Sequence, residues 1–141
     1  MTLYIVDLTV PADTAQTSPI EKTVKIEEEV IVKVMVHFPA GCHGYVYTAC
    51  YYGEEQIFPR PYGSYLHGDA ETITWEEYYE LPESPCILTI KAWSPGTNYN
   101  HTIIWRINAL PKWVVFWWLP LQRLLNFLTR AITLFGRGGG K

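Results

Sequence analysis

Apolar and polar residues alternate along most of residues 1–110, the pattern that half-buried β-strands produce. The clearest case is the nine-residue run 30–38, which ends at Pro39 and Gly41. One face of this run is entirely apolar, so we expect it to point into a core, and it carries Val30, Val32, Val34, Val36 and Phe38. The other face is mixed and carries Ile31, Lys33, Met35 and His37.

Similar alternation predicts further strands at residues 4–10, 24–26, 45–52, 72–81, 86–93 and 102–110, with a short edge strand at 56–58. Turns rich in proline and glycine separate these segments. Strands do not alternate with helical patterns, which argues against a parallel sheet. We therefore predict an all-β domain over residues 1–110, an antiparallel β-sandwich of about seven strands.

Two stretches of this domain resemble immunoglobulin-like and fibronectin type III-like modules. The segment 23–38 is similar to their A′–B strand pair, and the segment 81–93 to the E–F corner that leads into strand F. The resemblance implies an Ig-like sandwich in which Cys50 and Cys86 are neighbours, so a disulfide between them stays open. The segment that matches strand B lacks the cysteine of these modules, and the corner lacks their tyrosine. A jelly roll or another viral-type sandwich is therefore retained as an alternative.

After Pro111 the apolar residues recur every three or four positions, as on one face of a helix. Residues 113–119 form a continuous aromatic and apolar run, and Pro120 predicts a kink or the first turn of a new helix. Residues 111–141 are thus predicted to be a Trp-rich, basic, amphipathic helical tail with a Gly-rich end. Its candidate membrane or assembly residues are Trp113, Phe116, Trp117, Trp118, Leu121, Arg123, Leu124, Leu125, Leu128, Arg130, Ile132 and Phe135.

Four environments are open to this tail. The tail is long enough to span a membrane, but Arg123 and Arg130 would then lie inside the bilayer. Inserting each arginine near the bilayer centre costs about 2.5–3.5 kcal/mol. A helix lying on an anionic membrane suits the Trp-rich, acid-free sequence better. The heptad spacing of Leu121, Leu128 and Phe135 also allows packing against further copies or other structural subunits. Finally, the tail could fold back as the core helix of its own domain.

The net charge of −3 over 141 residues combines two unequal parts. Residues 1–110 hold fourteen acidic and six basic side chains, a net charge of −8, whereas residues 111–141 hold five basic side chains and no acidic one. The acidic body argues against nucleic-acid binding there. A hydrophobic content of 48% excludes global disorder. The first residues lack the basic and long apolar regions of a cleavable signal peptide, so we expect none.

No pattern in the body indicates catalysis. Cys42 and His43 are adjacent in sequence and Cys50 is distant, which does not match the paired spacing of zinc ligands. The serines lack a nucleophile elbow, and no Gly-rich loop precedes a helix to hold phosphate. Runs of glutamate at 27–29, 54–55 and 76–77 are typical of solvated strand edges. We predict no enzyme activity, no cofactor, no metal ion and no small-molecule substrate.

The irregular segment 53–71 is the best recognition candidate in the body. Tyrosine and arginine combine apolar area with polar tips and are frequent in binding hot spots. Its candidate contact residues are Phe58, Arg60, Tyr62 and Tyr65. The alternative is that this segment folds onto its own sandwich.

Together these features predict a non-catalytic structural or assembly protein. We expect a virion component, such as a vertex, spike-base or tail protein, that is located in the virion or at a membrane. Its sandwich would be anchored by the C-terminal helix to a membrane or to a multi-subunit shell, as a homo-oligomer or with other structural subunits. The alternative is a surface binding module that recognises a carbohydrate or a protein through segment 53–71.

Overall fold

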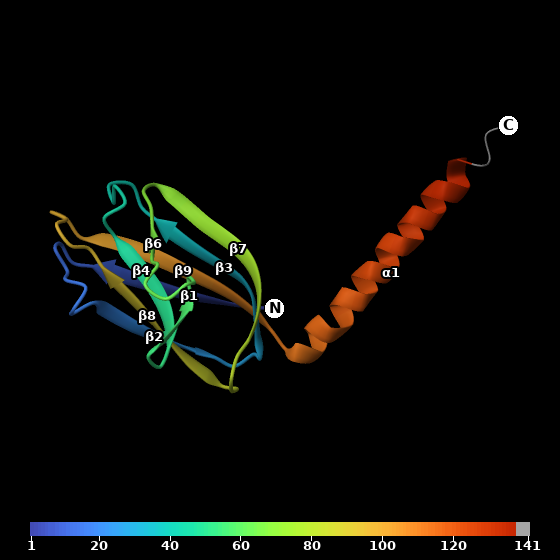
Figure 1. Cartoon of the computed structure of the whole chain (residues 1–141), viewed down its shortest axis with the longest axis horizontal. Helices are drawn as coiled ribbons and strands as arrows, with labels where there is room; N and C mark the ends of the chain where they lie inside the picture. The colour runs from blue at the N-terminus through green and yellow to red at the C-terminus, as the bar shows by residue number, and fades with distance from the viewer. Residues whose placement is uncertain (138–141) are drawn as a thin grey trace.

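Two antiparallel sheets and one long C-terminal helix make up the computed structural model (Figure 1). It describes residues 1–137, and the side chains of residues 118, 119 and 137 lie outside that description. The first sheet contains, in spatial order, β1 (Thr2–Val10), β9 (His101–Leu110), β3 (Val30–Phe38) and β7 (Glu71–Glu80). The second contains β2 (Ile20–Ile26), β8 (Cys86–Trp93), β4 (Tyr47–Tyr52) and β5 (Glu55–Phe58), with the short β6 (Leu66–His67) also paired to β4. The predicted antiparallel sandwich with a C-terminal helix is confirmed, with nine strands rather than about seven.

The strand order is that of a jelly roll. With β6 set aside, the first strand pairs with the last, β2 with β8, β3 with β7, and β4 with β5, and every pair is antiparallel. The chain is therefore one long hairpin whose two arms fold together into two sheets. In an immunoglobulin module the first two strands are neighbours in one sheet. Here β1 and β2 lie in different sheets. The strand pairing therefore matches the jelly roll, which the sequence had left open as an alternative to the Ig-like sandwich.

The core lies between the two sheets and draws its residues from the strands and the loops that connect them. Alternation is clean in β9 and in the second half of β1, where every second side chain is buried. A buried hydrogen bond crosses the core, from the indole Nε1 of Trp105 in β9 to the Thr48 Oγ1 in β4, at 3.0 Å. The Thr48 hydroxyl in turn donates to the Lys91 carbonyl at 2.8 Å. The buried indole N–H of Trp105 thereby has an acceptor, and its hydrogen bond joins one sheet to the other.

One part of the predicted core pattern is wrong. The register of β3 shifts between Ile31 and Lys33 against both of its neighbours, β7 and β9. This bulge reverses the local alternation, so Ile31 is fully buried in the core whereas Val32 lines a surface groove. The sequence does not reveal this shift, because Val30, Ile31 and Val32 are all apolar and either phase of the alternation fits them.

The three cysteines, Cys42, Cys50 and Cys86, are free thiols in the structure and are all buried. Burial raises the pKa of each of these thiols above its ordinary value, which keeps them in the neutral, unreactive form. They act as small apolar core residues, and Cys50 and Cys86 belong to the same core cluster.

Residues Lys112–Arg137 form a single 26-residue helix, α1, that extends away from the sandwich (Figure 1). Pro120 lies inside this helix rather than at the start of a second one. A proline there removes one backbone hydrogen bond, the one to the Phe116 carbonyl, from the helical ladder. At about 1.5 Å per residue the helix is about 39 Å long. The interpretation of the tail as a core helix of the same domain is therefore wrong, since the described residues of the core cluster all lie outside α1 and the large apolar side chains of α1 are exposed.

We expect the Trp105–Thr48 hydrogen bond to be a main determinant of stability. Thr48→Val keeps the shape of the side chain but leaves the indole N–H buried without an acceptor, which should lower the free energy of unfolding by about 1–3 kcal/mol. Urea unfolding followed by tryptophan fluorescence measures this change. The matched control is Thr23→Val on the exposed side of β2, for which we expect a change within about 0.5 kcal/mol. Equal effects of the two substitutions would contradict a special role for the buried bond.

Candidate functional site

The helix α1 continues directly from β9, a central strand of the first sheet. The last residue of β9, Leu110, still pairs with Val30, and Pro111 separates strand from helix. The Pro111 carbonyl accepts hydrogen bonds from the backbone N–H groups of Val114 and Val115, at 3.1 and 3.4 Å. The helix therefore starts one residue after a strand that is held on both sides, which limits how far its base can move.

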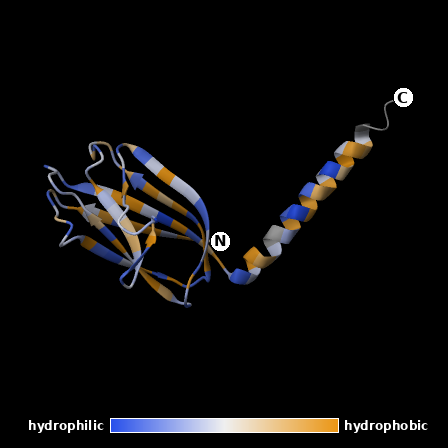
Figure 2. Cartoon of the chain, in the orientation of Figure 1, coloured by the Kyte–Doolittle hydropathy of each residue, from blue (hydrophilic) through white to orange (hydrophobic). Residues whose placement is uncertain are grey.

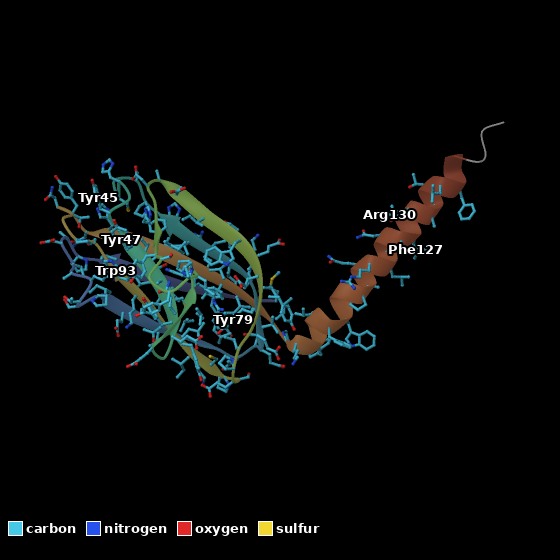
Figure 3. All side chains as sticks on the ribbon, viewed as in Figure 1. Tyr45, Tyr47, Tyr79, Trp93, Phe127 and Arg130 are labelled. Atoms are coloured by element: carbon cyan, nitrogen blue, oxygen red, sulfur yellow. The ribbon has the colours of Figure 1, made fainter. Side chains whose placement is uncertain are left out.

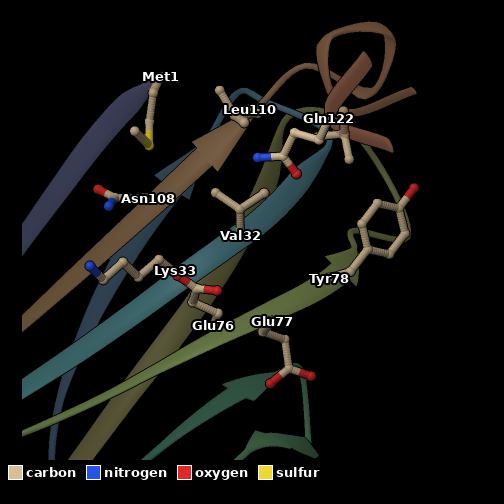
Figure 4. A pocket seen from close by; sticks show the side chains of 10 residues that line it. Met1, Val32, Lys33, Glu76, Glu77, Tyr78, Asn108, Leu110 and Gln122 are labelled. Atoms are coloured by element: carbon tan, nitrogen blue, oxygen red, sulfur yellow. The ribbon is translucent and has the colours of Figure 1, made fainter. Parts of the chain in front are cut away.

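Side-chain contacts between α1 and the sandwich are confined to the first turns of the helix. The Lys112 ammonium forms an ion pair with the Glu80 carboxylate at the end of β7, and this hydrogen bond raises the pKa of Lys112. Val115 is the one residue of α1 that is buried, among the side chains that the structure describes. It helps to line a groove of about 660 Å³ beside the β3 bulge, together with Val32, Tyr78, Leu110 and Gln122 (Figure 4).

Beyond this junction the apolar side chains of α1 are open to solvent. The predicted residues that are exposed are Trp113, Phe116, Trp117, Leu121, Leu124, Leu125, Leu128, Ile132 and Phe135. Trp118 belongs to the same prediction, but its side chain lies outside the described ones. Two exposed residues were not predicted, Phe127 and Leu134, because the sequence interpretation followed one seam of the helix. Placing all positions at 100° per residue would have identified both.

The helix has two chemically different faces (Figure 2). Arg123 and Arg130 are exposed on the polar side, seven residues apart, and Figure 3 shows Arg130 well clear of the sandwich. Thr129 and Thr133 each donate a hydrogen bond from the side-chain hydroxyl to the carbonyl four residues earlier, both at 2.8 Å. Within the described residues, no helix is long and apolar enough to span a bilayer.

The residues of segment 53–71 divide between core and surface. Phe58 is 2% exposed and packs edge-on against Trp75 and Tyr79, at ring-centroid distances of 5.8 and 5.4 Å. It is therefore a core residue and is not available to a partner. Arg60 is exposed and lies 6.0 Å above the Tyr79 ring. Tyr62 is 79% exposed and lies at the tip of the segment.

The buried amide of Gln56 holds this segment in place. Its Nε2 donates to the Pro59 and Ser64 carbonyls, both at 2.6 Å, and its Oε1 accepts from the Gly63 N–H at 3.3 Å. These bonds from one side chain take the place of strand pairing in residues 59–65, the loop between β5 and β6. Part of the segment folds onto the sandwich, as the alternative interpretation expected, while its tip stays exposed.

Next to this loop the outer face of the second sheet carries an aromatic cluster. Tyr65 packs edge-on against Trp93 at 4.7 Å, and Tyr47 stacks on the same indole at 6.2 Å. Tyr51 lies under the Lys91 ammonium at 4.9 Å, and burial together with the nearby tyrosines Tyr65 and Tyr62 raises its pKa. Trp93 itself is 4% exposed, because these tyrosines cover it, and we call Tyr47, Tyr51, Tyr62, Tyr65 and Lys91 the aromatic surface. Strand alternation alone would have placed Tyr47, Tyr51 and Trp93 on this outer face.

Among the described residues, no three His, Cys, Asp or Glu side chains are grouped as a metal ion requires. Cys42 and His43 are adjacent in sequence but differ in burial, because the thiol is in the core and the imidazole is exposed. The His43 ring lies 3.8 Å from the Asp69 carboxylate, whose pKa is lowered by backbone N–H groups of the same loop. Asp69 therefore caps a turn.

No protein-family model and no curated protein sequence matches the chain. Among solved structures, its fold is similar to a structure of Tomato aspermy virus, with a TM-score of 0.47 and 12% identity over 79% of each chain. It is also similar to the Yersinia pseudotuberculosis-derived mitogen, with a TM-score of 0.42 and 8% identity over 77% of this chain and 86% of that one. The coat protein of Tobacco streak virus has a TM-score of 0.30 and 11% identity over 78% and 88% of the two chains.

We expect Gln56 to control the order of the exposed loop. Gln56→Ala removes three hydrogen bonds and leaves two carbonyls without their partner, which should lower the free energy of unfolding by about 1–3 kcal/mol. It should also accelerate amide hydrogen exchange at Gly63, measured by NMR. The control is Gln16→Ala, because Gln16 is exposed and makes a single side-chain bond to the Tyr65 hydroxyl at 3.1 Å. If Gly63 exchanges at the same rate in both variants, Gln56 does not organise the loop.

Proposed function

We propose that this protein is a non-catalytic structural protein and a virion component, such as a vertex, spike-base or tail protein. Its helix α1 attaches the sandwich to a membrane or to a multi-subunit shell, and the sandwich faces outward. The attachment brings copies of the chain together or places each copy beside other structural subunits. No chemical reaction is assigned to the sandwich.

The observation that carries this proposal is the exposed apolar face of α1. Eleven large apolar side chains from Trp113 to Phe135 are exposed on a helix that reaches away from its own core (Figure 1). A contiguous apolar surface of this kind is costly in water and marks an interaction site. The core of the sandwich already closes between its two sheets, so it cannot supply the cover.

The architecture of the body supports a structural role. Jelly rolls are common in viral capsid domains and in lectins, and strands paired along a nested hairpin leave few free edges. The division of charge along the chain also favours attachment by the tail. The acidic body is well suited to water, and the basic helix is well suited to an apolar or anionic surface. This architecture supports a class of function and does not by itself assign one.

Two variants test the attachment. One ends at Leu110, and the other is the full chain with Leu124→Ser and Leu128→Ser. We expect full-length protein to sediment as an oligomer or to bind liposomes, and both variants to lose that behaviour because the exposed apolar area is reduced. The melting temperature of each variant should stay within about 5 °C of the full chain, because the core lies in the strands. A monomeric full-length protein that binds no liposomes would refute the proposal.

The aromatic surface favours a second candidate function, recognition of a carbohydrate or a protein. The Tyr47 and Tyr65 rings there pack on the buried indole of Trp93, and the Tyr62 ring is exposed in the loop that Gln56 holds. Rigid aromatic side chains bind with little loss of conformational entropy.

Tyr62→Ser tests this second function on an array of immobilised glycans and on purified cell-surface proteins. We expect at least a tenfold loss of binding, on the order of a hot-spot truncation. Tyr99→Ser is the matched control, because Tyr99 is 76% exposed and lies in a different loop. A similar loss in both variants would show that the tyrosines act non-specifically.

A further inference from the structure

We propose that the partner of α1 is the surface of an anionic lipid bilayer. The helix lies in the interface with its apolar face among the acyl chains and its arginines at the phosphate groups. This inference rests on the proposed function and chooses one of the two attachments that it leaves open. Three properties of the helix carry it: the width of its apolar face, the sign of its charge and the position of its aromatic residues.

The apolar face is too wide for a single helical seam. At 100° per residue, the polar positions between 122 and 137 fall within an arc of about 120°, and the apolar positions between 121 and 135 cover about 180°. The heptad seam of a two-stranded coiled coil uses only the a and d positions. Here that seam is Leu121, Leu124, Leu128, Ala131 and Phe135.

Four large apolar residues remain outside the seam, on both of its sides. Leu125 and Ile132 flank one side, and Phe127 and Leu134 flank the other. Their exposed fractions are high, at 68% for Phe127, 72% for Ile132 and 73% for Leu134. A second copy of α1 packed along the seam would leave these side chains in water. A lipid interface covers the whole half of the helix at once.

The charge of the helix has a single sign. Its sequence holds Lys112, Arg123, Arg130 and Arg137 and no acidic residue. Helices that pair with each other often carry opposite charges beside the seam, whereas in α1 apolar residues occupy those positions and Arg123 and Arg130 lie on the side away from the seam, where a second copy supplies no acidic partner. Phosphate groups of an anionic membrane complement this charge, and each basic side chain near such a surface adds to binding. The same membrane repels the acidic sandwich, in keeping with a helix that diverges from its body (Figure 1).

Aromatic residues are concentrated at the start of the helix. Trp113, Phe116 and Trp117 are all exposed, and Phe116 and Trp117 pack edge-on at 6.0 Å. Tryptophan favours the boundary between headgroups and acyl chains, because its ring is apolar and its N–H finds a partner there. This places the base of α1, next to the ion pair between Lys112 and Glu80, at the depth of the headgroups.

Binding of the full-length protein to vesicles tests the inference. The vesicles contain phosphatidylcholine alone or phosphatidylcholine with about 30% phosphatidylglycerol, and co-sedimentation measures the partition coefficient. Arg123→Gln with Arg130→Gln should weaken binding to the anionic vesicles about 25-fold and leave binding to the neutral ones unchanged. Lys22→Gln with Lys25→Gln removes the same charge from β2 and should weaken neither.

A second pair of substitutions separates lipid from helix pairing. Phe127→Ser with Leu134→Ser removes apolar area outside the seam, so lipid binding should fall by at least about tenfold for each residue. A coiled-coil dimer would be unaffected by it. Circular dichroism and thermal melting show whether the variants keep the helix and the sandwich.

The outcomes separate this inference from the proposed function. Binding that prefers anionic vesicles and is lost in the arginine and the Phe127 and Leu134 variants supports it. Equal binding to both kinds of vesicle overturns it. A stable oligomer without vesicle binding also overturns it but leaves attachment to a protein shell intact. A monomer that binds no vesicles overturns both.

Discussion

The rest of the structure depends on the closure of the core between two sheets. Trp105 reaches from β9 to the Thr48 hydroxyl of β4, and the apolar side chains around this bond fill the space between the sheets. Among the described side chains of α1 only Val115 is buried, and the large apolar ones are exposed, so the sandwich does not cover them. In the proposed function their cover comes from outside the domain.

The nested strand pairing decides where the apolar face of α1 is presented. Since the first and last strands are neighbours, β9 lies in the interior of a sheet and is hydrogen-bonded to β1 on one side and to β3 on the other. The helix leaves from the end of this strand, beside the bulge in β3 and the ion pair between Lys112 and Glu80. Because α1 follows a strand that is paired on both sides, the proposed attachment would hold the sandwich at a defined position relative to the surface that α1 binds. The aromatic surface, in contrast, belongs to the other sheet, so the two proposed functions would use separate parts of the chain.

The segregation of charge works with this geometry. Acidic residues are confined to the body and the helix is purely basic, so a negatively charged surface attracts one and repels the other. The helix can then lie along such a surface while the sandwich stays in water. If the apolar face of α1 were instead covered by protein, its arginines could stay in water, and binding would depend less on salt and on charge substitution than binding to an anionic membrane.

Much of this was readable from the sequence. The alternation in β8 and β9 and the helical spacing after Pro111 depend only on local periodicity, and they correctly predicted the antiparallel sandwich and the C-terminal helix. The candidate attachment residues on this helix, such as Leu124 and Ile132, are exposed, and their role stays a prediction. Phe127 and Leu134 were missed although the same spacing contains them. The recognition role of segment 53–71 also stays a prediction, and aromatic character alone does not separate Phe58, which is in the core, from Tyr62 at the surface.

Local pattern cannot say which strands become neighbours, because pairing depends on contacts between residues far apart in the chain. The sequence by itself therefore determined the element types, the division of charge and the amphipathic nature of the tail. The jelly-roll order, the bulge that exchanges Ile31 for Val32, and the free thiols of Cys50 and Cys86 were decided by tertiary structure. So was the projection of α1, because periodicity predicts a helix but does not say whether its apolar side chains pack on the sandwich or stay exposed.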